Sequence, residues 1–229
     1  MQAVILCAGK GIRMKDLTKE LPKPLLEVNS KSLLLRKMES LPQSISEIIL
    51  IIGYKGEKII KTFGNSFNEI PITYIEDKTL TGTAHALWSA KEILRGRFLV
   101  MMGDDLYAKK DLEACSRFDF SIVCKRAVQD ETGSRITKTP DGRLENFVTQ
   151  ESYLQSHTDD GLIFTGLYSL TVSIFNHEPV KMKTKDEWGL PQTLLVANRE
   201  YPVTIIETDD WISITCPEDI VLAETVRFS

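Results

Sequence analysis

Short apolar runs alternate with helix-like patterns through the first half of this chain, and this alternation constrains the fold most. Residues 2–7 are almost continuously apolar, as expected for a strand that is buried on both faces of a sheet. Similar runs follow at residues 47–53, 70–76 and 97–102. They are separated by segments with apolar residues at helical spacing, at residues 32–41, 55–63 and 83–94. The order predicts βαβ units and hence an α/β fold with a mostly parallel sheet.

The second half of the chain has a different pattern. Its strand-like and helix-like segments are predicted at residues 120–124, 135–138, 144–149, 162–170, 190–197 and 203–208. The segment Thr139-Pro140-Asp141-Gly142-Arg143 is typical of a hairpin turn, because Pro presets φ and Asp and Gly tolerate the remaining angles. Pro217 is well placed in the first turn of a last helix. We therefore expect one domain with a smaller sheet contributed by its second half.

Composition excludes several classes of function. The net charge of −4 is unfavourable for non-specific binding of nucleic acid, which usually needs a basic face. No run approaches the roughly 20 apolar residues that a membrane-crossing helix needs. The 4 cysteines are far apart and include no Cys-x-x-Cys pair, which argues against a metal cluster. We expect a cytoplasmic protein with no nucleic-acid or membrane partner.

A glycine-rich loop follows the first strand, in the segment Ala8-Gly9-Lys10-Gly11-Ile12-Arg13-Met14. Gly9 and Gly11 allow backbone N–H groups to approach a phosphate closely, because glycine has no Cβ and tolerates positive φ. Arg13 and the nearby Lys23, in Leu21-Pro22-Lys23-Pro24-Leu25, add the positive charge that a polyphosphate needs. The segment therefore predicts a binding site for a nucleoside triphosphate.

Two common phosphate loops do not fit this segment. A P-loop requires Gly-x-x-x-x-Gly-Lys-Ser/Thr, which the segment does not contain. The dinucleotide fingerprint Gly-x-Gly-x-x-Gly fails because Met14 stands at the third glycine.

Further motifs follow in order along the chain: Gly82-Thr83-Ala84-His85-Ala86, Gly103-Asp104, Thr165-Gly166-Leu167-Tyr168 and Trp211-Ile212-Ser213-Ile214-Thr215-Cys216-Pro217-Glu218-Asp219. Together with the glycine loop and the Lys23 segment, they resemble the sugar-1-phosphate nucleotidyltransferases, also called sugar nucleotide pyrophosphorylases. Each motif alone is a weak signal, but their order and their spread over nearly the whole chain make the resemblance strong.

The resemblance implies a Rossmann-like α/β fold with a mixed, mostly parallel sheet flanked by helices and a small sugar-side sheet. It implies one nucleotidyltransferase domain over residues 1–229, with a donor nucleotide half at about 1–115 and an acceptor half at about 116–229. We expect no C-terminal left-handed β-helix. In the implied reaction, a sugar 1-phosphate attacks the α-phosphorus of a nucleoside triphosphate, giving a nucleotide-sugar and pyrophosphate. Homo-oligomers are a further expectation from the family.

By the same resemblance, Arg13 holds the departing β- and γ-phosphates, and Lys23 bridges the α-phosphate and the incoming phosphate. Asp104 binds Mg²⁺, a hard cation that suits carboxylate and phosphate oxygens. The other nucleotide-binding positions are Leu6, Ala8, Gly9, Gly11, Asp77, Gly82 and Thr83. The acceptor-binding positions are Glu151, Gly166 and Glu187.

Two departures from the family concern the metal and the acceptor. Ser213 stands where the last motif usually carries a second metal-binding Asp, so Asp209, Asp210 or Ser213 itself is the candidate second ligand. Gln150-Glu151-Ser152 stands where many members have Glu-Lys-Pro, so the acceptor site lacks that lysine.

A third departure concerns the base. Asp77 stands where uridylyl and thymidylyl members usually have Gln. A carboxylate only accepts hydrogen bonds, which suits the N–H donors of guanine. The Gly82 motif, however, is more similar to the uridylyl and thymidylyl members. UTP or dTTP is therefore favoured as the donor, with GTP close behind.

Two other functions stay open. One is a CTP-dependent cytidylyltransferase acting on a phospho-alcohol such as phosphocholine, and the other is a non-catalytic, nucleotide-binding regulatory homologue. The serines at 152 and 213 favour them. Retention of Arg13, Lys23 and Asp104 favours the catalytic interpretation.

Overall fold

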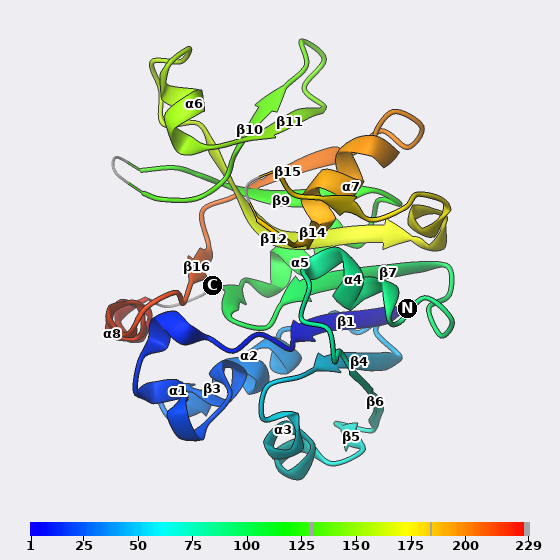
Figure 1. Ribbon diagram of the computed structural model, residues 1–229, viewed down its shortest axis with the longest axis vertical. Coiled ribbons are helices and arrows are strands. Elements are labelled where there is room, and N and C mark those ends of the chain that lie inside the picture. Colours follow the sequence, from blue (N-terminus) through cyan, green and yellow to red (C-terminus); the bar gives the residue numbers. More distant parts are fainter. Residues whose placement is uncertain (129–130, 184, 227–229) are drawn as a thin grey trace.

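The first strand, β1 (Gln2–Cys7), lies in the middle of a sheet of ten strands in the computed structural model (Figure 1). The structure describes residues 1–128, 131–183 and 185–226. β1 pairs in parallel with β4 (Glu47–Ile52) on one side and with β7 (Arg97–Met102) on the other. β6 (Ile70–Glu76) continues the parallel set beyond β4, and the short β5 (Ser66–Phe67) ends it. The predicted α/β fold is confirmed.

One long strand, β12 (Leu162–Thr171), joins the second half of the chain to this sheet. It pairs antiparallel with β7 through Tyr168–Thr171 and antiparallel with β9 (Ser121–Arg126). β9 also pairs in parallel with β15 (Thr204–Thr208). The sheet is therefore mixed, and it is continuous from one half of the chain to the other.

The predicted hairpin forms at the far end of the sheet. β10 (Arg135–Lys138) pairs antiparallel with β11 (Leu144–Val148) and, on its other side, with β12. Figure 1 shows this hairpin and α6 (Gln150–Leu154) at the upper end of the molecule, opposite α3 (Gly56–Phe63) and β5.

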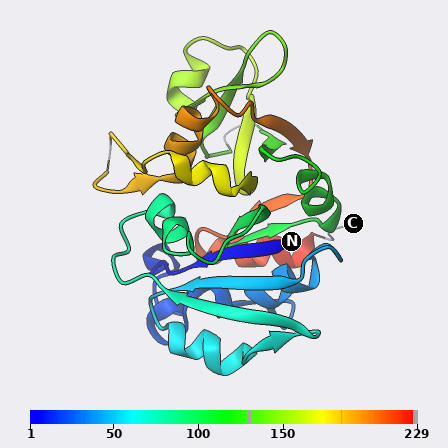
Figure 2. The same ribbon diagram turned by 90° about the vertical axis from the view of Figure 1, so that its right-hand side faces the viewer.

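Alternate residues of β1 face two separate hydrophobic cores. Ala3, Ile5 and Cys7 pack in the core that α2 (Leu33–Glu39) covers. Val4 packs in the other core, with residues of α4 (Thr83–Trp88). Because neighbouring residues of a strand point to opposite faces, helices must cover both sides of this sheet. Figure 2 shows the central strands β1, β4 and β6 side by side, with α3 along their lower edge.

Several elements differ from their prediction or lacked one. The helix predicted over residues 83–94 ends at Trp88, and turns follow it. β8 (Asp105–Tyr107) pairs with β16 (Trp211–Ser213), and strands of three residues are too short for periodicity to reveal. The remaining described elements are α1 (Leu17–Glu20), β2 (Glu27–Val28), β3 (Lys31–Ser32), α5 (Lys109–Cys115), β13 (Val180–Lys181), β14 (Trp188–Gly189), α7 (Leu190–Ala197), α8 (Pro217–Thr225) and the 3-10 helices η1 (Ile12–Met14), η2 (Lys23–Leu25) and η3 (Val172–Asn176).

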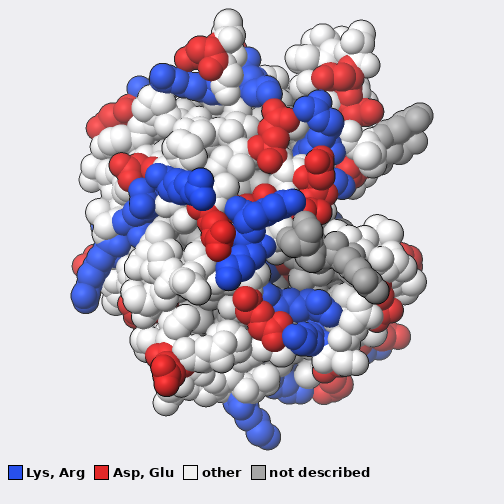
Figure 3. All heavy atoms as spheres, turned by 180° about the vertical axis from the view of Figure 1, so that it is seen from behind, with Lys and Arg blue, Asp and Glu red and all other residues white. Residues whose placement is uncertain are grey.

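The surface carries charges of both signs. On the face drawn in Figure 3, basic and acidic side chains are interspersed and do not form one broad basic area. Among the described residues, no helix has the length and apolar character needed to cross a membrane.

Candidate active site

A pocket of about 540 Å³ opens where β1, β6 and β7 end. The carboxyl ends of parallel strands are the usual ligand-binding edge of such a sheet. Most site residues predicted from the sequence line this pocket: Leu6, Ala8, Gly9, Gly11, Arg13, Lys23, Asp77, Gly82, Thr83, Asp104 and Glu187. Residues that are far apart in the chain therefore meet in one place.

The glycine loop forms the first wall of the pocket. Gly11 has φ 62°, in the left-handed region that favours glycine, and it begins η1. The Thr18 hydroxyl donates to the carbonyl of Gly11 at 3.1 Å, and Tyr54 Oη donates to the carbonyl of Thr18 at 3.0 Å. These contacts hold the loop from behind and leave Arg13 exposed at the pocket.

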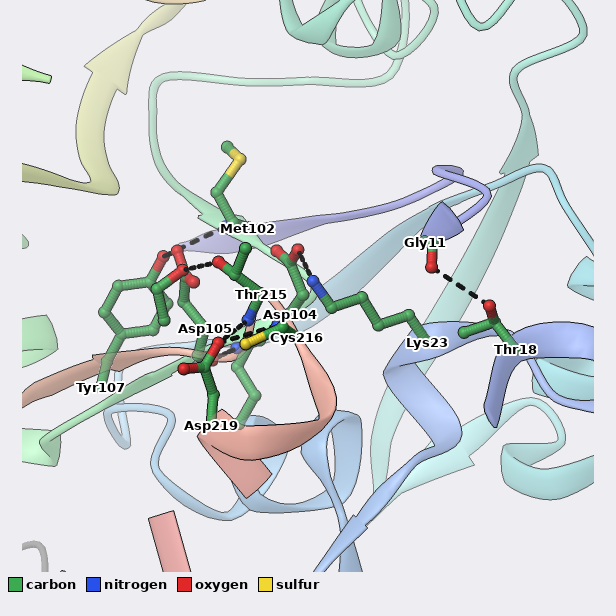
Figure 4. Close-up of polar contacts among 12 residues, drawn as sticks. Gly11, Thr18, Lys23, Met102, Asp104, Asp105, Tyr107, Thr215, Cys216 and Asp219 are labelled. Atoms are coloured by element: carbon green, nitrogen blue, oxygen red, sulfur yellow. Dashed lines mark hydrogen bonds and ion pairs between the residues drawn. The ribbon is translucent and has the colours of Figure 1, made fainter. Parts of the chain in front are cut away.

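An ion pair joins the two charged groups at the centre of the predicted site. Lys23 Nζ donates to Asp104 Oδ2 at 2.7 Å (Figure 4). Lys23 is buried, with 6% of its surface exposed, whereas the Asp104 side chain is 37% exposed. Lys23 lies in the short helix η2, between two prolines that fix its backbone. The pair therefore presents a carboxylate and an ammonium group to the same part of the pocket.

The residue after Asp104 is turned away from the pocket. Asp105 is 5% exposed and lies opposite Ser213 in the β8–β16 pair. Burial raises the pKa of the Asp105 carboxyl group, and the neighbouring Asp104 raises it further, while a hydrogen bond from Ser213 opposes the shift. Lys37 Nζ, from α2, donates to the main-chain carbonyl of Asp105. Burial lowers the pKa of Lys37, and the nearby Asp105 and Asp104 oppose that shift.

The last motif shapes the neighbouring wall. Asp219 Oδ2 accepts hydrogen bonds from the backbone N–H groups of Thr215 and Cys216, at 2.6 and 2.8 Å, and thereby caps α8. Thr215 lines the pocket as a result of this turn. Figure 4 shows Thr215 and Cys216 beside Asp105 and next to Asp104.

Asp77 also organises a loop. Its Oδ1 accepts from Thr79 N at 2.9 Å, from the Thr79 hydroxyl at 2.8 Å and from Leu80 N at 3.1 Å. One of the two carboxylate oxygens is therefore committed to the backbone turn that leads to Gly82.

The start of α4 is docked against a segment from the second half. Trp188 N donates to the carbonyl of Thr81 at 2.7 Å, and Leu190 N donates to the Thr83 hydroxyl at 3.0 Å. The Trp188 ring stacks on His85 with centroids 4.4 Å apart. Gly82 has φ 115°, and a Cβ there would lie 2.4 Å from the carbonyl oxygen of Trp188. A glycine is therefore required for this close approach.

The segment between β13 and β14 brings two charged side chains to the pocket, Lys185 and Glu187. Met182 N donates to the carbonyl of Glu187 at 2.8 Å and closes the segment at its base. Lys181 pairs with Asp186 at 2.5 Å. Lys185 forms no ion pair with the other residues that the structure describes.

Five of the predicted site residues do not line the pocket: Glu151, Gly166, Asp209, Asp210 and Ser213. Glu151 lies on α6, at the upper end of the molecule in Figure 1. Asp210 pairs with Lys110 at 2.5 Å. Ser213 points toward Thr215, with their hydroxyl oxygens 3.2 Å apart. The roles predicted for these five residues therefore stay predictions. Gly166 packs against Met102, and Met102 lines the pocket.

Several lining residues were absent from the sequence prediction: Met102, Ser134, Phe147, Met182, Lys185, Trp188, Pro191 and Gln192. Met102 directly precedes the Gly103-Asp104 motif, and the others belong to segments that have no nucleotide-binding pattern of their own. Only the tertiary fold brings them to the glycine loop, so the sequence carried no signal for them.

A comparison with known protein families identifies the family to which the chain belongs. Residues 2–131 match the model of the nucleotidyl transferase family. The chain belongs to the nucleotidyl transferase family. The match contains the glycine loop, Lys23 and Asp104, so the resemblance to sugar-1-phosphate nucleotidyltransferases is confirmed.

Individual relatives of this nucleotidyl transferase agree. The chain is 28% identical over 232 residues to the UTP–glucose-1-phosphate uridylyltransferase AglF of Haloferax volcanii, covering 96% of this chain and 93% of the relative. It is 29% identical over 225 residues to the bifunctional protein GlmU of Methanocaldococcus jannaschii, covering 97% of this chain and 53% of that relative. The chain thus spans about half of that bifunctional protein.

A solved structure shows the same fold. A Bacillus anthracis protein assigned as a glucose-1-phosphate thymidylyltransferase superposes with a TM-score of 0.82 at 18% identity, covering 100% of this chain and 97% of the other. At this level of identity, the likeness concerns the fold alone.

Proposed function

We propose that this nucleotidyl transferase moves a nucleotidyl group from UTP or dTTP to a sugar 1-phosphate, with release of pyrophosphate. The observation that carries the proposal is the Lys23–Asp104 ion pair, 2.7 Å long, at the centre of a pocket that begins with a glycine loop. Similarity to a uridylyltransferase over nearly the whole chain supports the choice of donor and of acceptor class.

The proposed chemistry needs positioning and charge neutralisation more than a covalent intermediate. Arg13 would hold the β- and γ-phosphates as they leave. Lys23 would contact the oxygens around the α-phosphorus, where negative charge develops during attack. Glu187 would accept hydrogen bonds from hydroxyl groups of the sugar.

The residues present fit a magnesium ion with few protein ligands. Asp104 offers a partly exposed carboxylate at the pocket, and the hydroxyl of Thr215 lies on the same wall. Asp105 is buried, and the described residues contain no group of three or more His, Cys, Asp or Glu that could hold a metal. Mg²⁺ commonly uses one or two carboxylates together with substrate phosphates and water. When bound, it would neutralise charge on the triphosphate.

Lys185 is proposed as the cation of the acceptor side. The segment Gln150-Glu151-Ser152 has no lysine, and Glu151 does not line the pocket. Lys185 reaches the pocket from the segment that also carries Glu187. Lys185 would therefore bind the phosphate of the acceptor. Its ammonium group can donate a charge-assisted hydrogen bond to a phosphate, and it lies on the segment whose Glu187 would bind the sugar.

A pyrophosphate-release assay tests the proposal. The purified protein is incubated with Mg²⁺, each nucleoside triphosphate in turn, and a panel of acceptors that contains several sugar 1-phosphates and, as the non-sugar acceptor, phosphocholine. Release with UTP or dTTP and a sugar phosphate is expected, and Lys23→Ala should remove most of it. Release only with CTP and phosphocholine would contradict the sugar acceptor, and no release with any pair would contradict the enzymatic interpretation for this panel.

A further inference from the structure

A fully buried lysine lies directly behind the pocket. Lys37 belongs to α2, is 2% exposed and does not line the pocket. Its ammonium group donates to the main-chain carbonyl of Asp105 and lies 4.8 Å from the centre of the Tyr107 ring. A buried charge is costly unless it is paired and hydrogen-bonded, so an apolar residue would be the ordinary choice on this face of a helix. The position of Lys37 therefore calls for a reason other than stability.

The segment that follows Asp104, β8 (Asp105–Tyr107), is also held by contacts of the Tyr107 side chain. The Tyr107 hydroxyl donates to the carbonyl of Thr165, on β12, at 3.0 Å, and it lies 3.3 Å from Asp105 Oδ2. The backbone N–H of Met102 donates to that hydroxyl at 3.4 Å. Figure 4 shows Tyr107 and Asp105 on one side of Asp104, with Lys23 approaching from the opposite side.

Asp104 itself has little to fix its direction. Among the described residues, its carboxylate accepts a hydrogen bond from Lys23, at 2.7 Å, and the side chain is 37% exposed. Its orientation is set by the backbone on both sides, and the carbonyl of the next residue is the group that Lys37 holds. Small displacements of a metal-binding or phosphate-binding carboxylate cost activity steeply.

We propose that Lys37 is a positioning residue, which holds the peptide after Asp104 so that the Asp104 carboxylate faces the metal and the triphosphate. The inference rests on the role that the proposed function gives to Asp104. Lys37 touches no substrate. It acts through the Asp105 carbonyl, and the Tyr107 hydroxyl holds the same segment against the acceptor half.

A purely structural role for Lys37 makes a different prediction. Methionine matches the length of lysine but leaves the buried Asp105 carbonyl without its donor, so Lys37→Met should lower the melting temperature by several degrees and stay folded at the assay temperature. If Lys37 only supported folding, any loss of activity would follow the loss of folded protein. If it positions Asp104, metal binding and turnover fall in a fully folded protein.

The test measures Mn²⁺ binding by electron paramagnetic resonance in the presence of pyrophosphate, together with kcat and the Mg²⁺ midpoint of the reaction. Lys37→Met should weaken Mn²⁺ binding about 10-fold and lower kcat by a similar factor, because a group that orients a metal ligand is typically worth 10- to 100-fold. The nucleotide KM should change less than about 2-fold, since Lys37 makes no substrate contact. Lys31→Met is the matched control, because Lys31 pairs with Glu39 at the surface and should change none of these values.

A second variant guards against misfolding of the first. Tyr107→Phe removes only the hydroxyl and should weaken Mn²⁺ binding in the same direction by a smaller factor. Mn²⁺ binding by Lys37→Met within 2-fold of the wild type would overturn the inference, as would losses that match the loss of folded protein at the assay temperature. Because Mn²⁺ binding needs no turnover, a wild-type protein that binds Mn²⁺ through Asp104 but releases no pyrophosphate would contradict the proposed function alone.

Discussion

The basic side chains at the pocket come from two distant parts of the chain. Arg13 and Lys23 follow β1, whereas Lys185 comes from the segment between β13 and β14. This distribution places positive charge on both sides of the point where a phosphate group would be transferred. Under the proposed function, each substrate would have its own cation, and the contribution of each can be measured separately.

Lys185→Gln should therefore affect one substrate only. We expect the KM for the sugar 1-phosphate to rise about 10-fold, because a hydrogen bond between charged groups contributes roughly 1.5–3 kcal/mol. The nucleotide KM should stay within about 2-fold of the wild type. Steady-state kinetics with each substrate varied in turn provide the measurement.

Lys183→Gln is the control for that variant, since Lys183 is exposed on the same segment and does not line the pocket. A rise in the nucleotide KM of Lys185→Gln, with the acceptor KM unchanged, would place Lys185 on the donor side instead.

Pocket residues could be predicted from the sequence where they belong to one short motif. Residues that come together only in the folded chain were missed. Gly9, Gly11 and Arg13 lie within one short loop, so their spacing alone indicates phosphate binding. Lys185 and Lys37 have no such pattern. Lys37 even interrupts the apolar face of its helix, and its partner Asp105 lies far along the chain. Long-range contacts of this kind are set by tertiary packing, which spacing does not encode.

At the scale of elements, the junction between α4 and β14 links the two halves of the pocket. The Thr81 carbonyl and the Thr83 hydroxyl accept backbone hydrogen bonds from the segment that follows Glu187. The loop that leads to Gly82 and the segment that carries Glu187 are therefore not independent. A change in either of them should alter the KM values of both substrates.

Gly82→Ala tests this link. The new Cβ would lie 2.4 Å from the Trp188 carbonyl oxygen, so β14 must move. We expect the KM of both substrates to rise about 10-fold or more, with a lower melting temperature. Thermal unfolding and two-substrate kinetics are the measurements.

Gly64→Ala separates backbone strain from displacement of β14. Gly64 also has a positive φ, 61°, but a Cβ there meets nothing within 4 Å. Its ψ of −142° places it in a region that is nearly confined to glycine, so this variant should lose about 1–3 kcal/mol of stability from strain and keep both KM values. Equal kinetic effects in the two variants would contradict the proposed link.

Elements were predictable from the sequence in proportion to their length and burial. β1, β4 and β7 are six-residue apolar runs, and each was predicted close to its observed bounds. β8 and β16 have three residues each and form only through their mutual pairing. Neither strand has enough residues to show a period of two.

At the scale of the whole molecule, one sheet extends through both halves of the chain. β12 pairs with β9 along one side and with β7 and β10 along the other. No sheet edge separates the first half of the chain from the second in the part that the structure describes. We expect the two halves to unfold together.

The reactivity of two buried thiols, one in each half of the chain, tests whether the halves unfold together. Burial raises the pKa of Cys7, on β1, to about 12, and it raises the pKa of Cys124, on β9, well above its ordinary value. At pH 8 only about one Cys7 thiol in ten thousand is ionised, so neither cysteine should react in the native protein. The protein is exposed briefly to an alkylating reagent at increasing urea concentrations, and peptide mass spectrometry measures the modification of each cysteine. Both thiols should show the same urea midpoint for modification.

Cys216 is the internal control, because it is only half-buried and should react before unfolding. A lower urea midpoint for Cys124 than for Cys7 would show that the second half of the chain opens by itself, against the expectation from a continuous sheet.

The late position of β12 in the chain has a consequence for synthesis. β7 ends at Met102, but the strand that covers its free edge begins only at Leu162. While the ribosome makes the residues between them, a strand that is buried in the finished protein presents unpaired N–H and C=O groups. Such edges pair readily with other nascent chains. The interval between these two strands is therefore the period in which a newly made chain is most exposed to aggregation.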